Sequence, residues 1–385
     1  MTRKHLVLLV GLVVLAIIAA QCGGAAPTAT EAATQAPAAT EAPATEEPAA
    51  PAEPTDTPAP EPAAQEGSTL ATVRDRGKVL CAVSGSLPAF GFLEPDGTFS
   101  GFDADYCRAI AAAIFDDPEA VEIQGVTATD RFPLLQSGGI DVLVRNTTWT
   151  FSRDTSLGFN FAPTTFYDGQ GMMVRKDSGI TSLEGLEGGS VCVQQGTTTE
   201  KNLADVFRFR GIDSEVIVFS DADSTRNAYD EGRCDGFTTD KSGLIASQLQ
   251  LSNPDDHIIL PETMSKEPLG PLVRHGDDQW FDIVKWITFG TFQAEELGIT
   301  SANVEEIAAS SEDPVVQNLL GGEGDLWLAL DMPADTMVRV IKHIGNYGEI
   351  YNRHLGPDTP YNVPRGVNAL WTDDPPGLMY SPPFR

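Results

Sequence analysis

Apolar and polar positions follow two recurring patterns along this chain from about residue 78 onward. Short apolar runs bounded by turn residues are typical of buried strands, and apolar residues at every third or fourth position are typical of helices. The first set of segments predicts strands at 78–84, 121–125 and 140–144, with helices at 101–115 and 129–137. A strand–helix–strand–helix–strand order predicts a parallel sheet with crossover helices.

The same order then begins again further along the chain. This second set predicts strands at 190–194, 215–219 and 234–239, with helices at 199–210 and 224–231. Two successive units in a chain of 385 residues predict two α/β lobes. Further helices are expected at 278–297 and from 337, before a Pro-, Gly- and Asn-rich extension that we expect to wrap over the first lobe.

The N-terminus has the pattern of an export signal at residues 1–21, where Arg3 and Lys4 precede an apolar run. The run is short for a membrane-spanning helix, and an uncleaved N-terminal anchor is the alternative. Cys22 follows in AAQCGG, which is similar to a bacterial lipobox, although Gln21 stands where a small residue is usual. We expect Cys22 to be lipidated; an unmodified cysteine beside a cleavage site is the alternative.

The segment 22–68 consists almost entirely of Ala, Pro, Thr and Glu and contains no Lys or Arg. Such a segment cannot bury enough apolar surface to offset its ordering entropy, so we expect a disordered tether. Whether it carries O-linked glycans is left open. A lipid and a flexible tether predict an extracytoplasmic lipoprotein, anchored to the cell membrane in the periplasm or at the outer face.

The composition excludes some classes of partner. The formal charge of −30 argues against nucleic acid, which selects basic faces, and against electrostatic docking to anionic lipid. The hydrophobic content of 41% is enough for sizeable cores. The sequence has no CxxC pair and no histidine cluster, so we expect no metal site and no cofactor.

Four further cysteines fit an exported protein. They are Cys81, Cys107, Cys192 and Cys234, an even set in an oxidising compartment. Three pairings are possible for four cysteines. We expect Cys81–Cys107 and Cys192–Cys234, because each bridge then stays within one lobe; four buried free thiols are the alternative.

Three polar segments follow expected strands, at the edge where open α/β sheets bind ligands. They read RNTTWTFSRDTSLGFNFA (145–162), QQGTTTE (194–200) and CDGFTTDKSG (234–243). Arg153 offers a planar fork for a carboxylate, and the threonine hydroxyls can donate further bonds. A surface salt bridge is the alternative for Arg153, and helix capping is the alternative for Asp240. Together the segments could hold both charged ends of a free amino acid.

The body of the chain, about 68–385, resembles the substrate-binding proteins of ABC importers for polar amino acids, and within them the general L-amino-acid-binding subgroup. The matching stretches include GFDADYCRAIAAAIF, RFPLLQSGGIDVLVRNTTWTFSRDTSLGFNF, VCVQQGTTTE, RCDGFTTD, GNYGEIYNR and PRGVNALW. The resemblance implies the type II periplasmic-binding-protein fold, in which a ligand cleft separates two α/β lobes joined by two crossing strands. The expected divisions are 69–164 for the first part of lobe 1, 165–269 for lobe 2, and 270–385 for the return to lobe 1 and its extension.

The resemblance also implies roles for particular residues. Arg153 matches the arginine that pairs with the ligand α-carboxylate, and Asp240 matches the carboxylate that binds the α-ammonium. Thr148 and Thr198 match hydroxyl groups that contact the head group from the two lobes. Asn146 falls where backbone groups commonly help.

The side-chain end of the expected site is less well defined by the resemblance. Arg131 occupies a position that can reach a ligand side-chain carboxylate, with a surface salt bridge as the alternative. Leu87 and Phe90 lie in a loop that usually supplies an apolar wall. Ala128 stands near where some glutamine binders place an aromatic ring, which implies a wider pocket and broad specificity.

The expected function is capture of L-amino acids and their delivery to the permease subunits of an ABC transporter, by a monomer without enzymatic activity. One alternative is an enzyme similar to cyclohexadienyl dehydratase on the same fold, which would need an acid or base over the ligand. None of the five histidines lies in the three polar segments. Another alternative is a sensory amino-acid-binding module that docks to a receptor.

Overall fold

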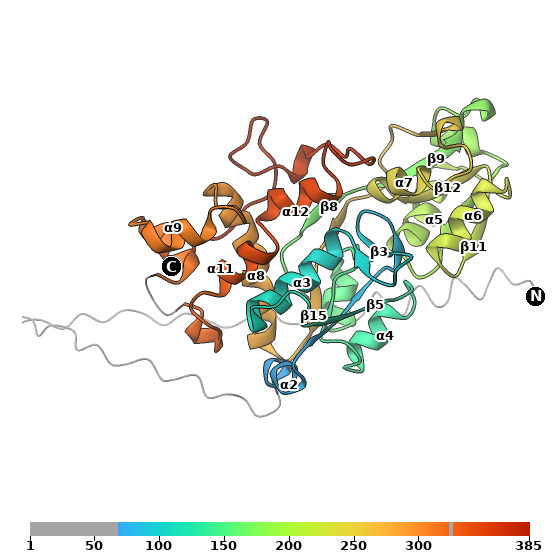
Figure 1. Ribbon diagram of the computed structural model, residues 1–385. Coiled ribbons are helices and arrows are strands. Elements are labelled where there is room, and N and C mark those ends of the chain that lie inside the picture. The colour runs from blue at the N-terminus through green and yellow to red at the C-terminus, as the bar shows by residue number, and fades with distance from the viewer. Residues whose placement is uncertain (1–67, 323–325) are drawn as a thin grey trace, which may run out of the picture. The chain divides into compact units, whose positions relative to one another are not determined.

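The structure is a computed structural model that describes residues 68–322 and 326–385. The expected signal segment, Cys22 and the tether lie outside these residues, apart from Ser68, which caps helix α2 (Thr69–Arg76). Two five-stranded sheets form the body of the protein, and a two-stranded sheet connects them in the chain (Figure 1). In the part of the chain that is described, no helix is both long and apolar enough to cross a membrane.

The first sheet has the three expected parallel strands at one side. Across the sheet the order is β5 (Val121–Gly125), β1 (Val79–Val83), β6 (Val142–Leu143), β15 (Leu272–Arg274) and β7 (Phe159–Phe161). Strand β1 is parallel to both β5 and β6, while β15 is antiparallel to β6 and to β7. Helices α3 (Phe102–Phe115) and α4 (Arg131–Gln136) connect the parallel strands, as the pattern predicted. A small sheet of β2 (Ser86–Leu87), β3 (Gly91–Leu93) and β4 (Phe99–Ser100) precedes α3.

The second sheet repeats this arrangement. Its order is β11 (Glu215–Phe219), β10 (Ser190–Gln194), β12 (Gly236–Asp240), β9 (Gln170–Arg175) and β13 (His257–Ile259). Strand β10 is parallel to β11 and β12, whereas β9 is antiparallel to β12 and β13. Helices α5 (Thr198–Arg210), α6 (Ala222–Asp230) and α7 (Lys241–Gln248) accompany these strands. We call each sheet with its packed helices a lobe.

Two crossing strands join the lobes, as expected. Strand β8 (Phe166–Asp168) leads from β7 into β9, and β14 (Glu267–Leu269) leads from β13 back into β15. The two strands pair antiparallel, with Glu267 opposite Asp168 and Leu269 opposite Phe166. The strands that follow each crossing run antiparallel to their neighbours, which is why each sheet is mixed rather than purely parallel.

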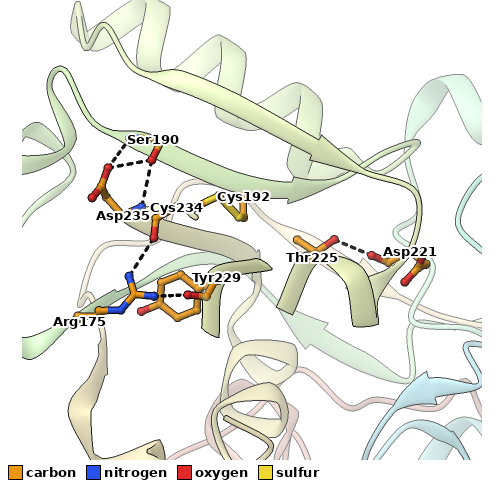
Figure 2. The surroundings of a disulfide bond; sticks show 8 residues. All are labelled: Arg175, Ser190, Cys192, Asp221, Thr225, Tyr229, Cys234 and Asp235. Carbon is orange, nitrogen blue, oxygen red and sulfur yellow. Dashed lines mark hydrogen bonds between the residues drawn. A yellow bond between two sulfur atoms is a disulfide. The ribbon is translucent and has the colours of Figure 1, made fainter. Parts of the chain in front are cut away.

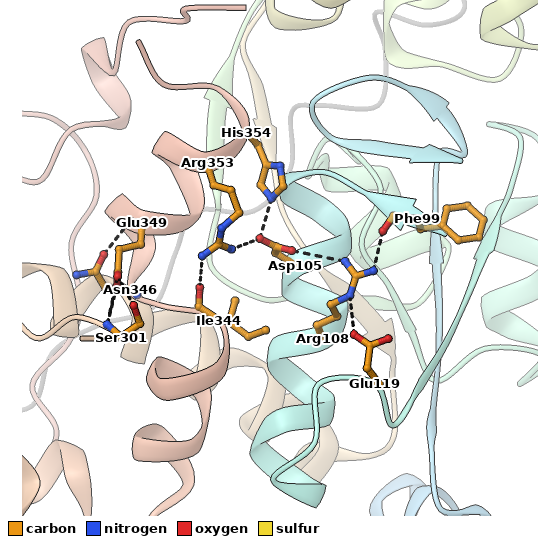
Figure 3. Close-up of polar contacts among 10 residues, drawn as sticks. All are labelled: Phe99, Asp105, Arg108, Glu119, Ser301, Ile344, Asn346, Glu349, Arg353 and His354. Carbon is orange, nitrogen blue, oxygen red and sulfur yellow. Dashed lines mark hydrogen bonds and ion pairs between the residues drawn. The ribbon is translucent and has the colours of Figure 1, made fainter. Parts of the chain in front are cut away.

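Helices from the C-terminal part complete the first lobe. They are α8 (Asp278–Glu296), α9 (Val304–Ser310), α10 (Pro314–Leu320), α11 (Thr336–His343) and α12 (Tyr347–His354), together with α2 (Thr69–Arg76) from the start. Asp105 of α3 connects to α12, because His354 Nε2 lies 2.7 Å from its carboxylate and Arg353 also donates to it (Figure 3). Burial acts to raise the pKa of Asp105, but the hydrogen bonds and charges of His354 and Arg353 lower it.

The extension after α12 contacts the first lobe and a crossing strand. Arg365 forms a two-bond ion pair with Glu295 of α8, with N–O distances of 3.0 and 3.1 Å. Asn368 accepts a 2.7 Å hydrogen bond from the backbone N–H of Tyr167 in β8. The C-terminal extension therefore packs on α8 and supports the strand that leads into the second lobe.

The two expected disulfides are present, one in each lobe. Cys81 of β1 is bonded to Cys107 of α3, and Cys192 of β10 is bonded to Cys234 just before β12. The Cα–Cα distances of 5.9 and 5.7 Å are ordinary for disulfides. Figure 2 shows the second bridge, beside which Arg175 donates a 2.9 Å hydrogen bond to the carbonyl of Cys234. Neither bridge crosses between the lobes.

Candidate functional site

The three polar segments lie at the carboxyl ends of β6, β10 and β12, and contacts between them cross from lobe to lobe. Asn146 Nδ2 donates a 3.3 Å hydrogen bond to Asp240 Oδ2. The hydroxyl oxygens of Thr148 and Thr198 are 3.3 Å apart. Both contacts join residues of the first lobe to residues of the second. The structure thus brings together four of the residues expected to bind a ligand head group.

Arg153 lies in a short π-helix, Ser152–Ser156, and its side chain points into the protein. The residue is 7% exposed, and Nη1 donates a 2.8 Å hydrogen bond to the carbonyl of Thr148. Its guanidinium carbon is 5.1 Å from the centre of the Phe132 ring. Among the described residues no carboxylate lies within 4.0 Å of it, so the surface salt bridge considered from the sequence is not formed.

Two carboxyl groups that do not contact Arg153 favour its charged form. Burial lowers the pKa of Arg153 to about 10, against the opposing effects of Glu267 and Asp240. With that pKa the guanidinium is charged at neutral pH. A buried cation that has no directly paired carboxylate is suited to an anionic ligand group.

Asp240 ends strand β12 and is buried, at 5% exposure. Burial raises its pKa well above the ordinary value, and the negative charges of Asp168 and Glu267 raise it further. It precedes helix α7, but its side chain makes no capping hydrogen bond. The carboxylate therefore faces a site where a positive group would be stabilised.

Thr198 is the first residue of α5, but it is not the cap of that helix. The adjacent Thr197 has that role, because its hydroxyl accepts a 3.0 Å hydrogen bond from the backbone N–H of Glu200. The hydroxyl of Thr198 is turned toward Thr148 instead. Two of the three hydroxyls in GTTTE thus have separate roles, Thr197 at the cap and Thr198 at the cleft, while Thr199 Oγ1 lies 2.9 Å from Thr197 Oγ1.

Glu267 was not recognised from the sequence, and it is central to the site. This residue of β14 is 1% exposed and accepts hydrogen bonds from Thr148 Oγ1 at 2.5 Å and from Thr198 Oγ1 at 2.9 Å. Asn202 Nδ2 donates to its other oxygen at 2.8 Å, and Ser265 donates there as well. A crossing strand thus carries a carboxylate that bonds to both lobes.

These bonds change what the two threonines can offer. A hydroxyl group has one proton to donate and two lone pairs to accept with. While Thr148 and Thr198 donate to Glu267, their lone pairs are what remains for another group. The hydroxyls in this arrangement favour a cation such as an ammonium group, whereas Arg153 favours the anion.

The remaining expected residues lie around this centre. Arg131 begins α4, is 2% exposed, and donates to Thr147 Oγ1 at 3.3 Å, while its Nε has no partner among the described groups. Leu87 lines a cavity between the lobes. Phe90 packs in the first lobe with ring centres 6.1 Å from Phe102 and 5.3 Å from Phe166. Its part in a ligand wall stays a prediction.

Glycine is required where the chain leaves Phe90 for α3. Gly101 has a φ of 115°, and a Cβ added there would lie 2.3 Å from the carbonyl oxygen of Phe90. Only a residue without a side chain fits this close approach. The same approach orders the N-terminus of α3, because the N–H of Asp103 donates to that carbonyl at 2.8 Å.

No metal-binding arrangement of three His, Cys, Asp or Glu side chains occurs in residues 68–322 and 326–385. Three of the described histidines have structural neighbours outside the cleft. His257 pairs with Tyr229, His343 with Asp116, and His354 with Asp105. Two lobes with buried charged groups at the cleft between them have the architecture of a protein that closes on a small ligand.

Comparison with known proteins identifies the family. Residues 79–299 match the family of bacterial extracellular solute-binding proteins, family 3, and the chain belongs to this family. A general L-amino acid-binding periplasmic protein, AapJ, of Rhizobium johnstonii is 50% identical over 325 residues, covering 84% of this chain and 94% of AapJ. The glutamate/glutamine/aspartate/asparagine-binding protein BztA of Rhodobacter capsulatus is 46% identical, covering 84% and 95%.

A solved structure shares the fold over nearly the same span. It is the ABC transporter / periplasmic binding protein from Brucella ovis with glutathione bound, which is 48% identical. The TM-score is 0.80, and the match covers 83% of this chain and all of the Brucella protein. The two-lobed fold inferred from the sequence is therefore confirmed by both family and structure.

Proposed function

We propose that this protein captures L-amino acids outside the cytoplasm and delivers them to the permease of an ABC transporter. One observation carries the proposal: the buried Arg153 and the buried Asp240 come from different lobes, so a guanidinium and a carboxyl group are available to the two ends of an amino acid. Closure of the lobes on such a zwitterion would change the surface that a permease meets. The names of the relatives, which describe amino acid binding, support the same ligand class.

A panel of ligands tests this proposal and the breadth of specificity. Because Ala128 stands near where some glutamine binders place an aromatic ring, we expect a wider pocket and several L-amino acids that raise the melting temperature. Ligand at a hundred times its Kd adds about 2.7 kcal/mol to the free energy of unfolding, which shifts the melting temperature by several degrees. The D-enantiomers serve as controls, and glutathione is included because the Brucella relative was solved with it.

The panel has two clear opposing outcomes. A shift with one amino acid alone would contradict broad specificity while leaving the function intact. No shift with any amino acid would contradict the function. We propose that the protein has no enzymatic activity, which the names of its relatives as amino-acid-binding proteins support. Turnover of arogenate or prephenate would support the dehydratase alternative.

We also propose that the mature protein is a monomer held at the membrane by a lipid on Cys22, with 22–68 as its tether and lobe boundaries at 164–165 and 269–270. The apolar run that ends just before Cys22 supports this arrangement. Cys22→Ser is expected to move the protein from the membrane fraction to the soluble fraction without changing its affinity for ligand. Membrane retention of this variant would support an uncleaved N-terminal anchor instead.

A further inference from the structure

Arg145 is a second buried arginine at the cleft whose charge has no direct partner. It follows β6, is 4% exposed, and donates from Nε to the carbonyl of Val126 at 3.0 Å. Its Nη1 makes a longer bond of 3.4 Å to Asn146 Oδ1. In the described part of the chain no carboxylate lies within 4.0 Å of this guanidinium, and no group accepts from its Nη2. The fork therefore keeps donors for another acceptor.

Asp103 is the carboxylate with the strongest electrostatic effect on Arg145, but the two side chains form no ion pair within 4.0 Å. Asp103 Oδ2 accepts a 2.8 Å hydrogen bond from the backbone N–H of Asn146. Burial raises the pKa of Asp103 to about 6, although that hydrogen bond and Arg145 act to lower it. Asp103 thus steadies the loop that carries Asn146 and does not occupy the guanidinium fork.

A cavity of about 30 Å³ lies beside Arg145 and is lined by both lobes. Ser84, Leu87, Arg145 and Asn146 line it from the first lobe, and Gln194, Thr225, Thr238 and Thr239 contribute from the second. A cavity of this size holds about two water-sized groups, which suits the end of a side chain. It adjoins the head-group clamp, because Asn146 lines it and donates to Asp240.

The number of buried cations near the clamp exceeds what one ligand carboxylate can satisfy. Arg131, Arg145 and Arg153 are all buried, and none has a carboxylate within 4.0 Å among the residues that the structure describes. The α-carboxylate of an amino acid would satisfy Arg153. A ligand with a second acid group would satisfy one more guanidinium and remove part of the cost of burying it.

We propose that Arg145 forms, with the cavity beside it, an anion subsite that receives the side-chain carboxylate of acidic amino acids. The proposal rests on the amino-acid-binding function proposed above and adds a specificity-determining residue to it. Gln194 and Thr239 make the opposite wall partly polar, whereas the hydroxyls of Thr225 and Thr238 donate to the backbone carbonyls of Asp221 and Gly171. Neutral ligand side chains with polar ends can form hydrogen bonds in the same cavity, but they form no ion pair with Arg145.

Arg131, which the sequence indicated for this role, is placed differently. Its guanidinium carbon is 4.7 Å from the centre of the Phe132 ring, and its Nη1 donates to Thr147. The hydroxyl of Thr147 in turn donates to the carbonyl of Arg145. Arg131 does not line the cavity. It therefore lies one layer behind the subsite that Arg145 reaches directly.

The experiment compares L-glutamate with L-glutamine, which have nearly the same shape and differ in charge. Calorimetry on the full chain is expected to show that Arg145→Gln weakens L-glutamate about tenfold or more, while L-glutamine changes by no more than about twofold. Arg131→Gln is the matched control, because Arg131 is equally buried and charged but lies away from the cavity. We expect its effect on the glutamate-to-glutamine ratio to be smaller.

The other outcomes are equally decisive. Equal weakening of both ligands by Arg145→Gln would show that Arg145 only supports the fold, and a larger ratio change in Arg131→Gln would return the role to Arg131. Arg145→Lys provides a second test if Arg145→Gln does not fold. It keeps the charge but loses the planar fork, so it should weaken L-glutamate more than L-glutamine, and equal weakening of the two ligands would overturn the proposal. If the wild-type protein binds no amino acid of the panel, the proposed function fails; if it binds other amino acids but not glutamate, only the subsite fails.

Discussion

Arg153→Ala is expected to weaken the binding of every amino acid ligand by about a hundredfold or more. The ligand α-carboxylate is removed from water when the lobes close on it, and Arg153 is the buried guanidinium expected to compensate its charge. Loss of one partner from a buried ion pair costs about 3–5 kcal/mol, and each tenfold in affinity corresponds to about 1.4 kcal/mol. The measurement is calorimetric titration with acidic, neutral and basic amino acids.

The loss should be nearly the same for each ligand, because the head group is common to all of them. Arg153→Lys should recover part of the affinity, since an ammonium keeps the charge but lacks the planar fork. Arg208→Ala is the control, because this arginine is on the surface, with 76% of its side chain exposed. Affinities of Arg153→Ala within a few-fold of the wild type would refute the amino-acid clamp.

Asp240→Asn is expected to weaken binding by about a hundredfold at neutral pH, because the buried ligand ammonium then loses the carboxylate that compensates its charge. The wild-type protein should in addition bind more weakly as the pH falls. The pKa of Asp240 is raised by burial and by Asp168 and Glu267, and a ligand ammonium would lower it again. Binding of the ammonium then releases a proton from Asp240. The affinity therefore rises with pH between the pKa of Asp240 in the ligand-bound protein and its pKa in the free protein, and the contribution of Asp240 to binding is lost below the lower of these two values.

The variant gives a test of this sign. Asparagine has no proton to release, so the affinity of Asp240→Asn should depend less on pH than that of the wild type. Some dependence should remain, because burial also raises the pKa of Asp168 to about 6. Titrations across the range from about pH 5 to 8 provide the comparison. Identical pH profiles would show that Asp240 does not meet the ammonium.

The strands and helices of both lobes were predictable because each forms from a local apolar pattern. Five-residue strands such as Val79–Val83 and Ser190–Gln194 agree with the predicted segments within two residues at either end. The antiparallel strands were not predicted as part of the sheets. Strand β9 gains its place by pairing with β12, whose residues follow it in the chain by more than sixty positions, and no short pattern contains that information.

The candidate site, like the fold, was predictable only where local sequence and topology determine it. The pairing of cysteines and the meeting of the three polar segments followed from the topology of two α/β lobes. Glu267 did not, because it lies in a three-residue strand and its bond to Thr148 joins residues 119 positions apart. The placement of Arg145 and Arg131 also depends on tertiary packing: both are buried arginines, but only one of them lines the cavity between the lobes.

The bonds of Glu267 give the protein an internal competitor for its ligand. A carboxylate on the crossing strand accepts hydrogen bonds from Thr148 and Thr198, so a ligand carboxylate can use those hydroxyls only by displacing it. The binding free energy then includes a difference between two sets of hydrogen bonds: those that the hydroxyls form with Glu267 and those that they form with the ligand carboxylate. Substitutions of Glu267 in crossing strand β14 would change this difference. They would raise or lower the affinity for all ligands together, because the residues that determine specificity stay unchanged.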